Sequence, residues 1–318
     1  YAGGKYNNDD GGDYEYSLGL NGLGACATQY ASEFMDVTVW RDGSKYSLHF
    51  EKGENIGGLK KEAADRKKTG TTIHWKPDLE VFTDINIPDE YFLDIMRRQA
   101  VVNAGVTFRF RSQKNGKFET TDICYKNGIL DYVAELAGED SLTQPVFIES
   151  ERRGRDRADK PEYKVRMSAA FCFSNKAAVI EYYHNSSWLE HGGAPERAAR
   201  SAFVSAVDAQ IKRAGKYQKN ESKVSWQDIA DCLILVTNCF STRTSYENQT
   251  KKAITNKFIQ EAMTEFFRSQ LEIYFIEHKT EADRACDQIL INKRSREQAE
   301  KARLNIRKKL SGSLDISN

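Results

Sequence analysis

The chain has 318 residues, of which 40% are hydrophobic and 29% are charged, and its formal net charge is +1. This length allows two domains with separate cores, and the near-zero charge indicates no general preference for acidic or basic partners. No apolar run approaches the roughly 18 residues that a membrane span needs, so the composition is that of a soluble globular protein without a membrane partner.

The first residue is Tyr1, and no charged region followed by an apolar one marks a signal peptide. We therefore expect a piece of a longer protein. Six cysteines and five histidines are scattered without metal-ligand spacing. This predicts reduced core cysteines in a cytoplasmic protein rather than a metal or redox site.

The first 24 residues are rich in glycine, with AGGK at residues 2–5 and GLNGLG at residues 19–24, directly before a predicted helix at 25–32. Glycines let backbone amides approach a ligand closely, and a helix start adds free N–H groups and a positive dipole end. The segment is therefore a candidate site for a nucleotide polyphosphate. A flexible surface loop is the alternative.

The order of these glycines argues against two common nucleotide sites. The pattern G-x-x-G-x-G reverses the dinucleotide fingerprint, and no strand-like run precedes it. Tyr6 follows Lys5 where a P-loop needs Ser or Thr for magnesium. A Rossmann domain and a Walker-type NTPase are both disfavoured.

The first region then alternates strand and helix patterns. A hairpin is predicted at 34–40 and 45–50 around Asp42-Gly43, followed by a strand at 70–75, a helix at 89–103 and a strand at 106–111. A turn follows at Lys114-Asn115-Gly116. We expect an α+β domain over residues 1–116.

A second region, residues 117–318, repeats the mixture. Strands are predicted at 120–125, 144–149, 163–173 and 178–183, with helices at 128–136 and 194–214. Ser225 resembles the start of a capping box, and the apolar run at 232–240 is typical of a buried central strand. Two helices, 256–276 and 280–310, close the chain.

A polar loop lies between that central strand and the helix at 256–276. Residues 247–252 read ENQTKK and present a lysine that can neutralise a terminal phosphate as a point charge. Such a lysine could let one domain sense what the other has bound. An ordinary solvated turn is the alternative.

Together these segments resemble the ATPase subunit of bacterial type IIA topoisomerases, the family of the DNA gyrase B and topoisomerase IV B proteins. AGGKY at 2–6 is similar to the family's lid, GLNGLGA at 19–25 to its glycine motif, and TGT at 69–71 to its sheet motif. VVNAGV at 101–106 is similar to the end of the ATP domain, and NGI at 127–129 to the entry helix of the transducer domain. EHGG at 190–193 is similar to its double glycine, and QTK at 249–251 to its nucleotide-contacting loop.

The resemblance runs from Tyr1 to about Leu310 and implies a fold. It implies part of a Bergerat (GHKL) ATPase sandwich over residues 1–116, followed by a ribosomal-protein-S5-like transducer domain over residues 117–318 with a long C-terminal helix.

The resemblance also implies an ATP site and its residues. One set would wrap the phosphates from the lid, the glycine motif and the sheet motif: Lys5, Gly19, Leu20, Asn21, Gly22, Leu23, Gly24, Ala25 and Thr71. Gln249 and Lys251 would contact the γ-phosphate from the transducer. Asn21 stands where the family usually has His, and Ala194-Pro195 where it usually has Thr-His. Proline is acceptable at the first turn of a helix.

The family's catalytic glutamate, its magnesium-holding asparagine and its adenine-reading aspartate precede the lid, and none has a match in this sequence. The resemblance thus implies ATP and Mg²⁺ as cofactors, with the metal ligands upstream and no catalytic residue in these 318 residues. We expect an ATP-dependent type IIA topoisomerase as the full-length protein, and little or no ATP turnover by this chain alone.

The closing helix carries a positive excess that could contact the phosphates of a DNA duplex without reading bases. The candidates are Lys293, Arg294, Arg296, Arg303 and Arg307. A solvated helix face with ion pairs is the alternative.

The family resemblance further implies an ATP-operated clamp that captures a DNA duplex for strand passage. It implies dimerisation through the ATPase subunits on ATP binding, an A-type DNA-cleavage subunit in an A2B2 heterotetramer, and a cytoplasmic, nucleoid-associated location in bacteria. Supercoiling depends on that cleavage subunit, so the sequence leaves gyrase and topoisomerase IV open. Two alternatives remain: another GHKL clamp of the mismatch-repair or chaperone type, and a nucleotide-sensing module without turnover.

Overall fold

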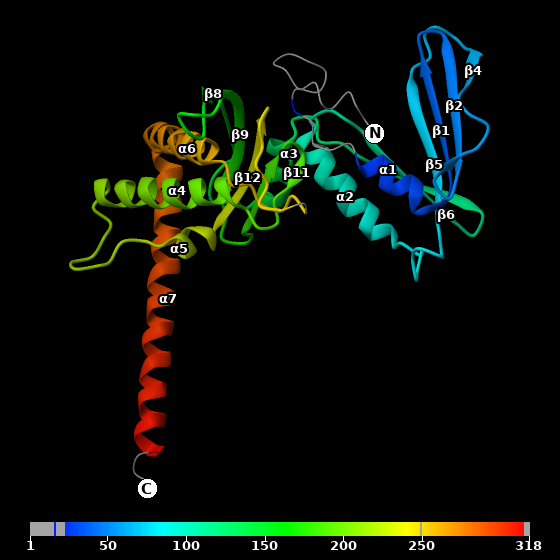
Figure 1. Cartoon of the computed structure of the whole chain (residues 1–318). Helices are drawn as coiled ribbons and strands as arrows, with labels where there is room; N and C mark the ends of the chain where they lie inside the picture. The colour runs from blue at the N-terminus through cyan, green and yellow to red at the C-terminus, as the bar shows by residue number, and fades with distance from the viewer. Residues whose placement is uncertain (1–15, 17–22, 249, 315–318) are drawn as a thin grey trace. The chain divides into compact units, whose positions relative to one another are not determined.

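The computed structural model describes residues 16, 23–248 and 250–314 (Figure 1). It divides into two compact units, Tyr1–Phe92 and Leu93–Asn318. The division falls within a helix, α2 (Asp89–Val102), which was predicted at nearly the same residues. The domain border expected after Gly116 stays a prediction.

The first unit holds a short helix and an antiparallel sheet in the order β3-β2-β1-β5, with β4 also paired to β2. Asp42 and Gly43 both have positive φ, which suits the two-residue turn of the predicted hairpin. The elements are α1 (Leu23–Tyr30), β1 (Ser32–Arg41), β2 (Ser44–Glu51), β3 (Glu54–Asn55), β4 (Lys60–Ala63) and β5 (Gly70–Pro77).

The second unit holds most of α2, a hairpin, a five-stranded sheet and the helices that pack on it. The sheet order is β11-β10-β12-β9-β8, in which only the β10–β12 pair is parallel. The strands are β6 (Phe108–Lys114), β7 (Lys117–Ile123), β8 (Val146–Gly154), β9 (Tyr163–Phe173), β10 (Val179–His184), β11 (Ser187–Trp188) and β12 (Leu233–Ser241). The helices after α2 are α3 (Ile129–Ala137), α4 (Ala194–Arg213), α5 (Trp226–Ala230), α6 (Lys257–Glu277) and α7 (Lys279–Leu314).

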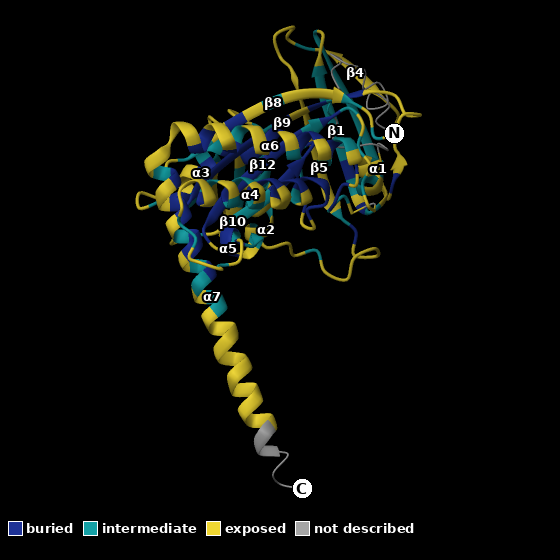
Figure 2. Ribbon diagram, turned by 90° about the vertical axis from the view of Figure 1, so that its left-hand side faces the viewer, coloured by how far each residue is buried: buried dark blue, intermediate teal, exposed yellow. Residues whose placement is uncertain are grey.

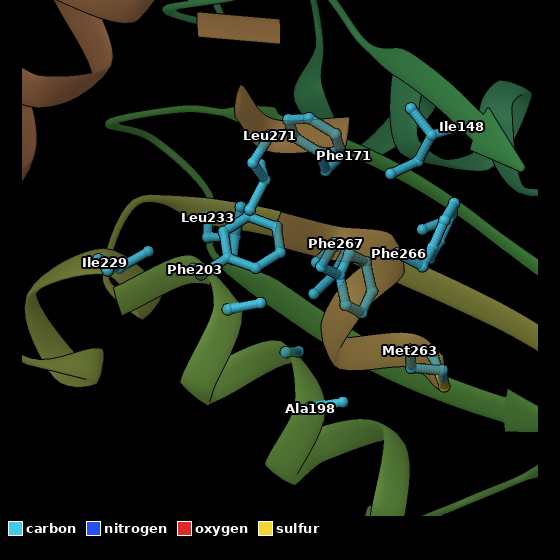
Figure 3. Packing of buried hydrophobic residues seen from close by; sticks show 14 of the residues in the cluster. Ile148, Phe171, Ala198, Phe203, Ile229, Leu233, Met263, Phe266, Phe267 and Leu271 are labelled. Atoms are coloured by element: carbon cyan, nitrogen blue, oxygen red, sulfur yellow. The ribbon is translucent and has the colours of Figure 1, made fainter. Parts of the chain in front are cut away.

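Both faces of this sheet are covered by helices. Alternate residues of β9 and β12 point to opposite sides and so belong to two different clusters. Phe171 and Leu235 belong to a cluster with α4, α6 and the start of α7, and Figure 3 shows Phe171, Phe203, Phe266, Phe267 and Leu271 packed together. Ala170 and Cys172 belong to a cluster with α3 and the end of α2. The near-continuous apolar run predicted as a central strand is β12, as its position between β10 and β9 confirms.

The 36-residue helix α7 changes character along its length (Figure 2). Its first part packs against the body through Ala282, Cys286 and Ile289, which are buried. From Lys301 to Ser311 every side chain is exposed. The structure thus confirms the predicted mixed α and β architecture with a long closing helix. The short strands β3, β4 and β11 were not predicted, since so few residues show no periodicity.

Candidate functional site

The structure describes only part of the predicted ATP site. Leu23, Gly24 and Ala25 form the exposed first turn of α1, which begins two residues earlier than predicted. Thr71 lies on β5 opposite Val39, near the end of the sheet away from Ser32. Outside the described residues lie Lys5, Gly19, Leu20, Asn21, Gly22 and Gln249.

The start of α1 has the character that an anion would need. Its first turn carries no acidic residue, and among the described residues no atom other than those of the neighbouring residues and the helix's own backbone lies within 4 Å of the position that a Cβ on Gly24 would take. The first N–H groups of a helix have no partner within it, and the dipole there favours negative charge. The role of this turn at a phosphate stays a prediction.

Lys251 lies in the loop between β12 and α6, which we call the Lys251 loop (residues 242–256). Its backbone N–H donates to the Asn248 carbonyl at 3.2 Å, and its φ of 59° is left-handed. The Lys251 ammonium lies 5.8 Å from the centroid of the Tyr246 ring. Lys251 is therefore half-buried, with its ammonium over an aromatic ring.

The C-terminal stem of the Lys251 loop is fastened to the segment before α4. The His191 N–H donates to the Lys252 carbonyl at 2.9 Å, and the Ala194 N–H donates to the Ile254 carbonyl at 2.9 Å. Lys252 also forms an ion pair with Glu190. Main-chain hydrogen bonds and one ion pair thus fix the end of the loop against the start of α4.

Gly193, the second of the predicted double glycine, makes this approach possible. Its φ is 88°, and an added Cβ would lie 2.3 Å from the Ile254 carbonyl oxygen. Only glycine tolerates both the backbone conformation and the backbone contact. Pro195 occupies the first turn of α4, as predicted. The double glycine therefore serves the loop as well as the helix.

Gly193→Ala is expected to lower the free energy of unfolding by about 2–3 kcal/mol, because the methyl group meets backbone that cannot rotate away. Gly215→Ala is the matched control, since Gly215 also has a positive φ but open space at its Cβ position. Urea unfolding of the two variants measures the difference. Equal losses would show that the contact with Ile254 is unimportant.

The N-terminal stem of the Lys251 loop is fastened by the turn between β10 and β11, which sequence analysis missed. The Asn185 amide nitrogen donates to the Ser241 carbonyl at 3.0 Å, and the Asn185 amide oxygen accepts from the Ser241 N–H at 2.9 Å. The same nitrogen lies 3.2 Å from the Thr244 hydroxyl. A polar Asn-Ser pair after an apolar strand was the available signal for this turn.

His184 lies beneath the same stem and is fully buried. Its Nε2 lies 2.8 Å from the Thr244 hydroxyl and 3.1 Å from the Ser241 hydroxyl. Burial lowers the pKa of His184 to about 3, so the ring stays neutral at physiological pH. The stem is thus held by neutral hydrogen bonds that do not titrate near neutrality.

The structure separates the predicted DNA-contacting residues into two groups. Lys293 has a fully buried side chain paired with Glu221 and Glu297, which corrects its assignment as a phosphate contact. Arg294 pairs with Glu221, and Arg296 pairs with Asp228 at 2.7 Å. These three cations hold α7 to the body. Arg303 and Arg307 are exposed, and no acidic residue lies between Lys301 and Leu310.

Two kinds of feature are absent from the described part of the chain. No cluster of three or more His, Cys, Asp or Glu side chains there has the arrangement of a metal site. No helix among those residues combines the length and apolarity needed to cross a bilayer.

Comparison with known proteins places these features in a family. The DNA gyrase B family matches residues 128–305. The DNA gyrase B protein of Enterococcus faecalis is 26% identical over 322 residues, which cover 100% of this chain and 48% of that protein. The DNA gyrase B protein of Thermotoga maritima is 24% identical over 97% of this chain and 48% of its own length. The chain thus spans about half the length of these relatives.

Solved structures show the same fold. The 43K ATPase domain of Thermus thermophilus gyrase B, in complex with an aminocoumarin, superposes with a TM-score of 0.68 at 23% identity, covering 89% of this chain and 74% of that one. The topoisomerase IV ATP-binding domain of Francisella tularensis gives a TM-score of 0.68 at 20% identity, covering 88% and 75%.

Proposed function

Since this chain belongs to the DNA gyrase B family, we propose that it is the ATP-binding and transducer part of the ATPase subunit of a type II DNA topoisomerase. The whole protein would be an ATP-operated clamp that captures a DNA duplex for strand passage. Its partners would be DNA, a second copy of the ATPase subunit on ATP binding, and an A-type cleavage subunit in an A2B2 assembly. Its place would be the bacterial cytoplasm, on the nucleoid.

The observation that best supports this proposal is the geometry of the Lys251 loop. Main-chain hydrogen bonds fasten its C-terminal stem, and the side-chain amide of Asn185 fastens its N-terminal stem, so the second unit sets the position of Lys251. A lysine so held can neutralise the γ-phosphate of ATP as a point charge, and its contact is lost on hydrolysis. Gln249 would be its partner in this contact.

The other phosphate contacts come from the first unit. The glycine motif at 19–25 would supply backbone N–H groups to the phosphates, with Lys5 and Thr71 nearby. Asn21 would keep a hydrogen-bond donor there but could not carry the charge that a histidine can. Mg²⁺ would be held by residues that have no match in this sequence.

Lys251→Ala is expected to lower ATP turnover by the complete gene product about 100-fold, because the γ-phosphate loses a positioned charge in the transition state. Lys257→Ala is the matched control. It removes an exposed lysine six positions further on, which pairs with Glu261 across one turn of α6. Steady-state ATP hydrolysis by both variants tests the proposal. Equal rates would show that the loop makes no specific contact with the nucleotide.

We further propose that the exposed end of α7 contacts duplex DNA through its backbone. Arg303 and Arg307 lie one helical turn apart and are exposed, unlike the paired cations nearer the body. Contacts with phosphates release counterions, so their number is read from the salt dependence of binding. Bases would not be read, because such contacts carry no sequence information.

Replacing Arg303 and Arg307 together by glutamine is expected to reduce the slope of log K against log salt by about 2 for duplex DNA binding. Replacing Lys279 and Arg284 by glutamine is the control, since both are exposed at the other end of the same helix. Titrations at several salt concentrations give the two slopes. An unchanged slope in the first variant would exclude this surface as a DNA contact.

A further inference from the structure

The turn between β10 and β11 touches two elements that are far apart in the sequence. The Gln99 side-chain amide of α2 donates to the Ser186 carbonyl at 3.0 Å. On its other side the turn bonds to the end of β12 through Asn185. One two-residue turn therefore connects α2 with the first residues of the Lys251 loop.

Asn185 makes this connection in the manner of an added strand residue. Its side-chain amide bonds both the N–H and the C=O of Ser241, which is how a neighbouring strand would pair with β12. Its own backbone N–H donates to the Cys239 carbonyl at 2.9 Å. The chain thus gains ladder hydrogen bonds at the point where β12 ends and the loop begins.

Burial and backbone conformation show how firmly this site is held. Asn185 is only 3% exposed and has a φ of 45°, a left-handed conformation that costs energy for a residue with a side chain. The bonds to Ser241 and Thr244 offset that cost. The neutral ring of His184 lies against the side-chain hydroxyl groups of the same two residues and is the second anchor of the stem.

We propose that Asn185 is a positioning residue for the Lys251 loop, and that the β10–β11 turn ties the position of this loop to α2. A shift of α2 would move the turn through Gln99, and the turn would move the loop stem through Asn185. The functional consequence, that Asn185 helps to place Lys251 at the nucleotide, rests on the proposed function. The link between α2 and the loop rests only on the hydrogen bonds of Gln99 and Asn185.

Asn185→Gly is the decisive substitution, because glycine keeps the left-handed backbone while every side-chain bond is lost. Ser186→Gly is the matched control in the same turn, since Ser186 also has a positive φ and contributes its backbone carbonyl to Gln99. Asn185→Asp is a graded variant that keeps the acceptor for the Ser241 N–H but loses the donor.

Hydrogen exchange of the 318-residue chain without nucleotide is the measurement. In Asn185→Gly the amides of residues 242–253 are expected to exchange at least about tenfold faster, with Asn185→Asp between it and the parent. Ser186→Gly should leave exchange in the loop unchanged. The thermal midpoint of unfolding of every variant should lie well above the temperature of the exchange experiment, which shows that the protein remains folded.

The tie to α2 is tested with Gln99→Leu. This variant is expected to speed exchange in the same loop, and its effect should not add to that of Asn185→Gly, because both act through one turn. Unchanged loop exchange in Asn185→Gly, or an equal increase in Ser186→Gly, would overturn the proposal for Asn185. Full additivity would overturn the tie to α2. Since no nucleotide is used, these results are independent of the Lys251→Ala test.

Discussion

Glu221→Ala is expected to lower the free energy of unfolding by about 3 kcal/mol at neutral pH, because it leaves a buried cation short of a partner. Lys293 has no exposed side-chain surface, and its ammonium lies 3.2 Å from Glu221 and 3.0 Å from Glu297. Glu297 is 32% exposed and Glu221 only 7%, so water screens the Glu297 charge more and Glu297 alone offsets less of the cost of burying Lys293. The loss would come from the cations that lose this partner, buried Lys293 above all and also Arg294, rather than from Glu221 itself.

The same carboxylate predicts a dependence of stability on pH. Hydrogen bonds from Arg294 first, and then from the Gln218 N–H and Lys293, hold the pKa of Glu221 at about 2, below its ordinary value of 4.5. A depressed carboxylate pKa stabilises the fold above the unfolded pKa, and that stabilisation is lost as pH falls toward the folded pKa. The gap between parent and Glu221→Ala should therefore narrow as pH falls from 4.5 toward 2.

The titration of His184 also makes stability depend on pH, and its contribution must be distinguished from that of Glu221. Its pKa is depressed from 6.5 to about 3, so the unfolded chain takes up a proton first and stability falls as pH drops through this range. Parent and variant share that loss, and only their difference reports on Glu221.

Two further variants serve as controls for Glu221→Ala. Glu119→Ala removes a carboxylate that is 67% exposed and paired with Lys114, and it should leave the urea midpoint nearly unchanged. Glu221→Leu combined with Lys293→Met should recover most of the lost stability, since it removes both buried charges. A double variant as unstable as Glu221→Ala would contradict this explanation.

The 318-residue chain alone is expected to hydrolyse ATP about 10²- to 10⁴-fold more slowly than the complete gene product of a family member, the usual effect of losing a general base. The family resemblance implies that the catalytic glutamate and the magnesium-holding asparagine lie outside these 318 residues. Without them the attacking water would be neither activated nor placed, even with the proposed phosphate contacts of α1 and of the Lys251 loop in place.

Phosphate release from ATP with Mg²⁺, measured on the purified 318-residue chain, tests this expectation. A polypeptide that supplies the missing glutamate and asparagine, added in trans, is the informative control, because it should restore turnover without any change in this chain. Turnover by the chain alone at the rate of the complete gene product would mean that one of its own carboxylates acts as the base.

Local sequence signals predicted much of the fold. The strand at 163–173 has the predicted bounds, because alternating side chains in a strand leave a pattern within a few residues. Asp42-Gly43 and Asn115-Gly116 were predicted as turns for an equally local reason, because Asp, Asn and Gly readily adopt positive φ. All four residues do have positive φ in the structure. The Ser225 N–H donates to the Asp228 carboxylate at 2.8 Å, as the capping pattern indicated.

The site was less predictable because its contacts join distant residues. Asn185 meets Ser241, which is 56 positions away, and Gly193 meets Ile254, so neither contact leaves a local pattern. Lys293 shows why the role of a charged residue could not be predicted. Nothing in the sequence near Lys293 distinguishes it from a solvated lysine, because its partner Glu221 lies 72 positions earlier. Only the fold distinguishes it from Arg303 and Arg307.

We expect Lys251 to reach the γ-phosphate of a nucleotide bound by the first unit. An ATP analogue with a photoreactive group on its γ-phosphate, irradiated with the complete gene product and mapped by mass spectrometry, tests it most directly. A crosslink is expected on the peptide that contains Lys251, and it should be lost when unmodified ATP competes. Crosslinks confined to other peptides, with that peptide unlabelled, would contradict it.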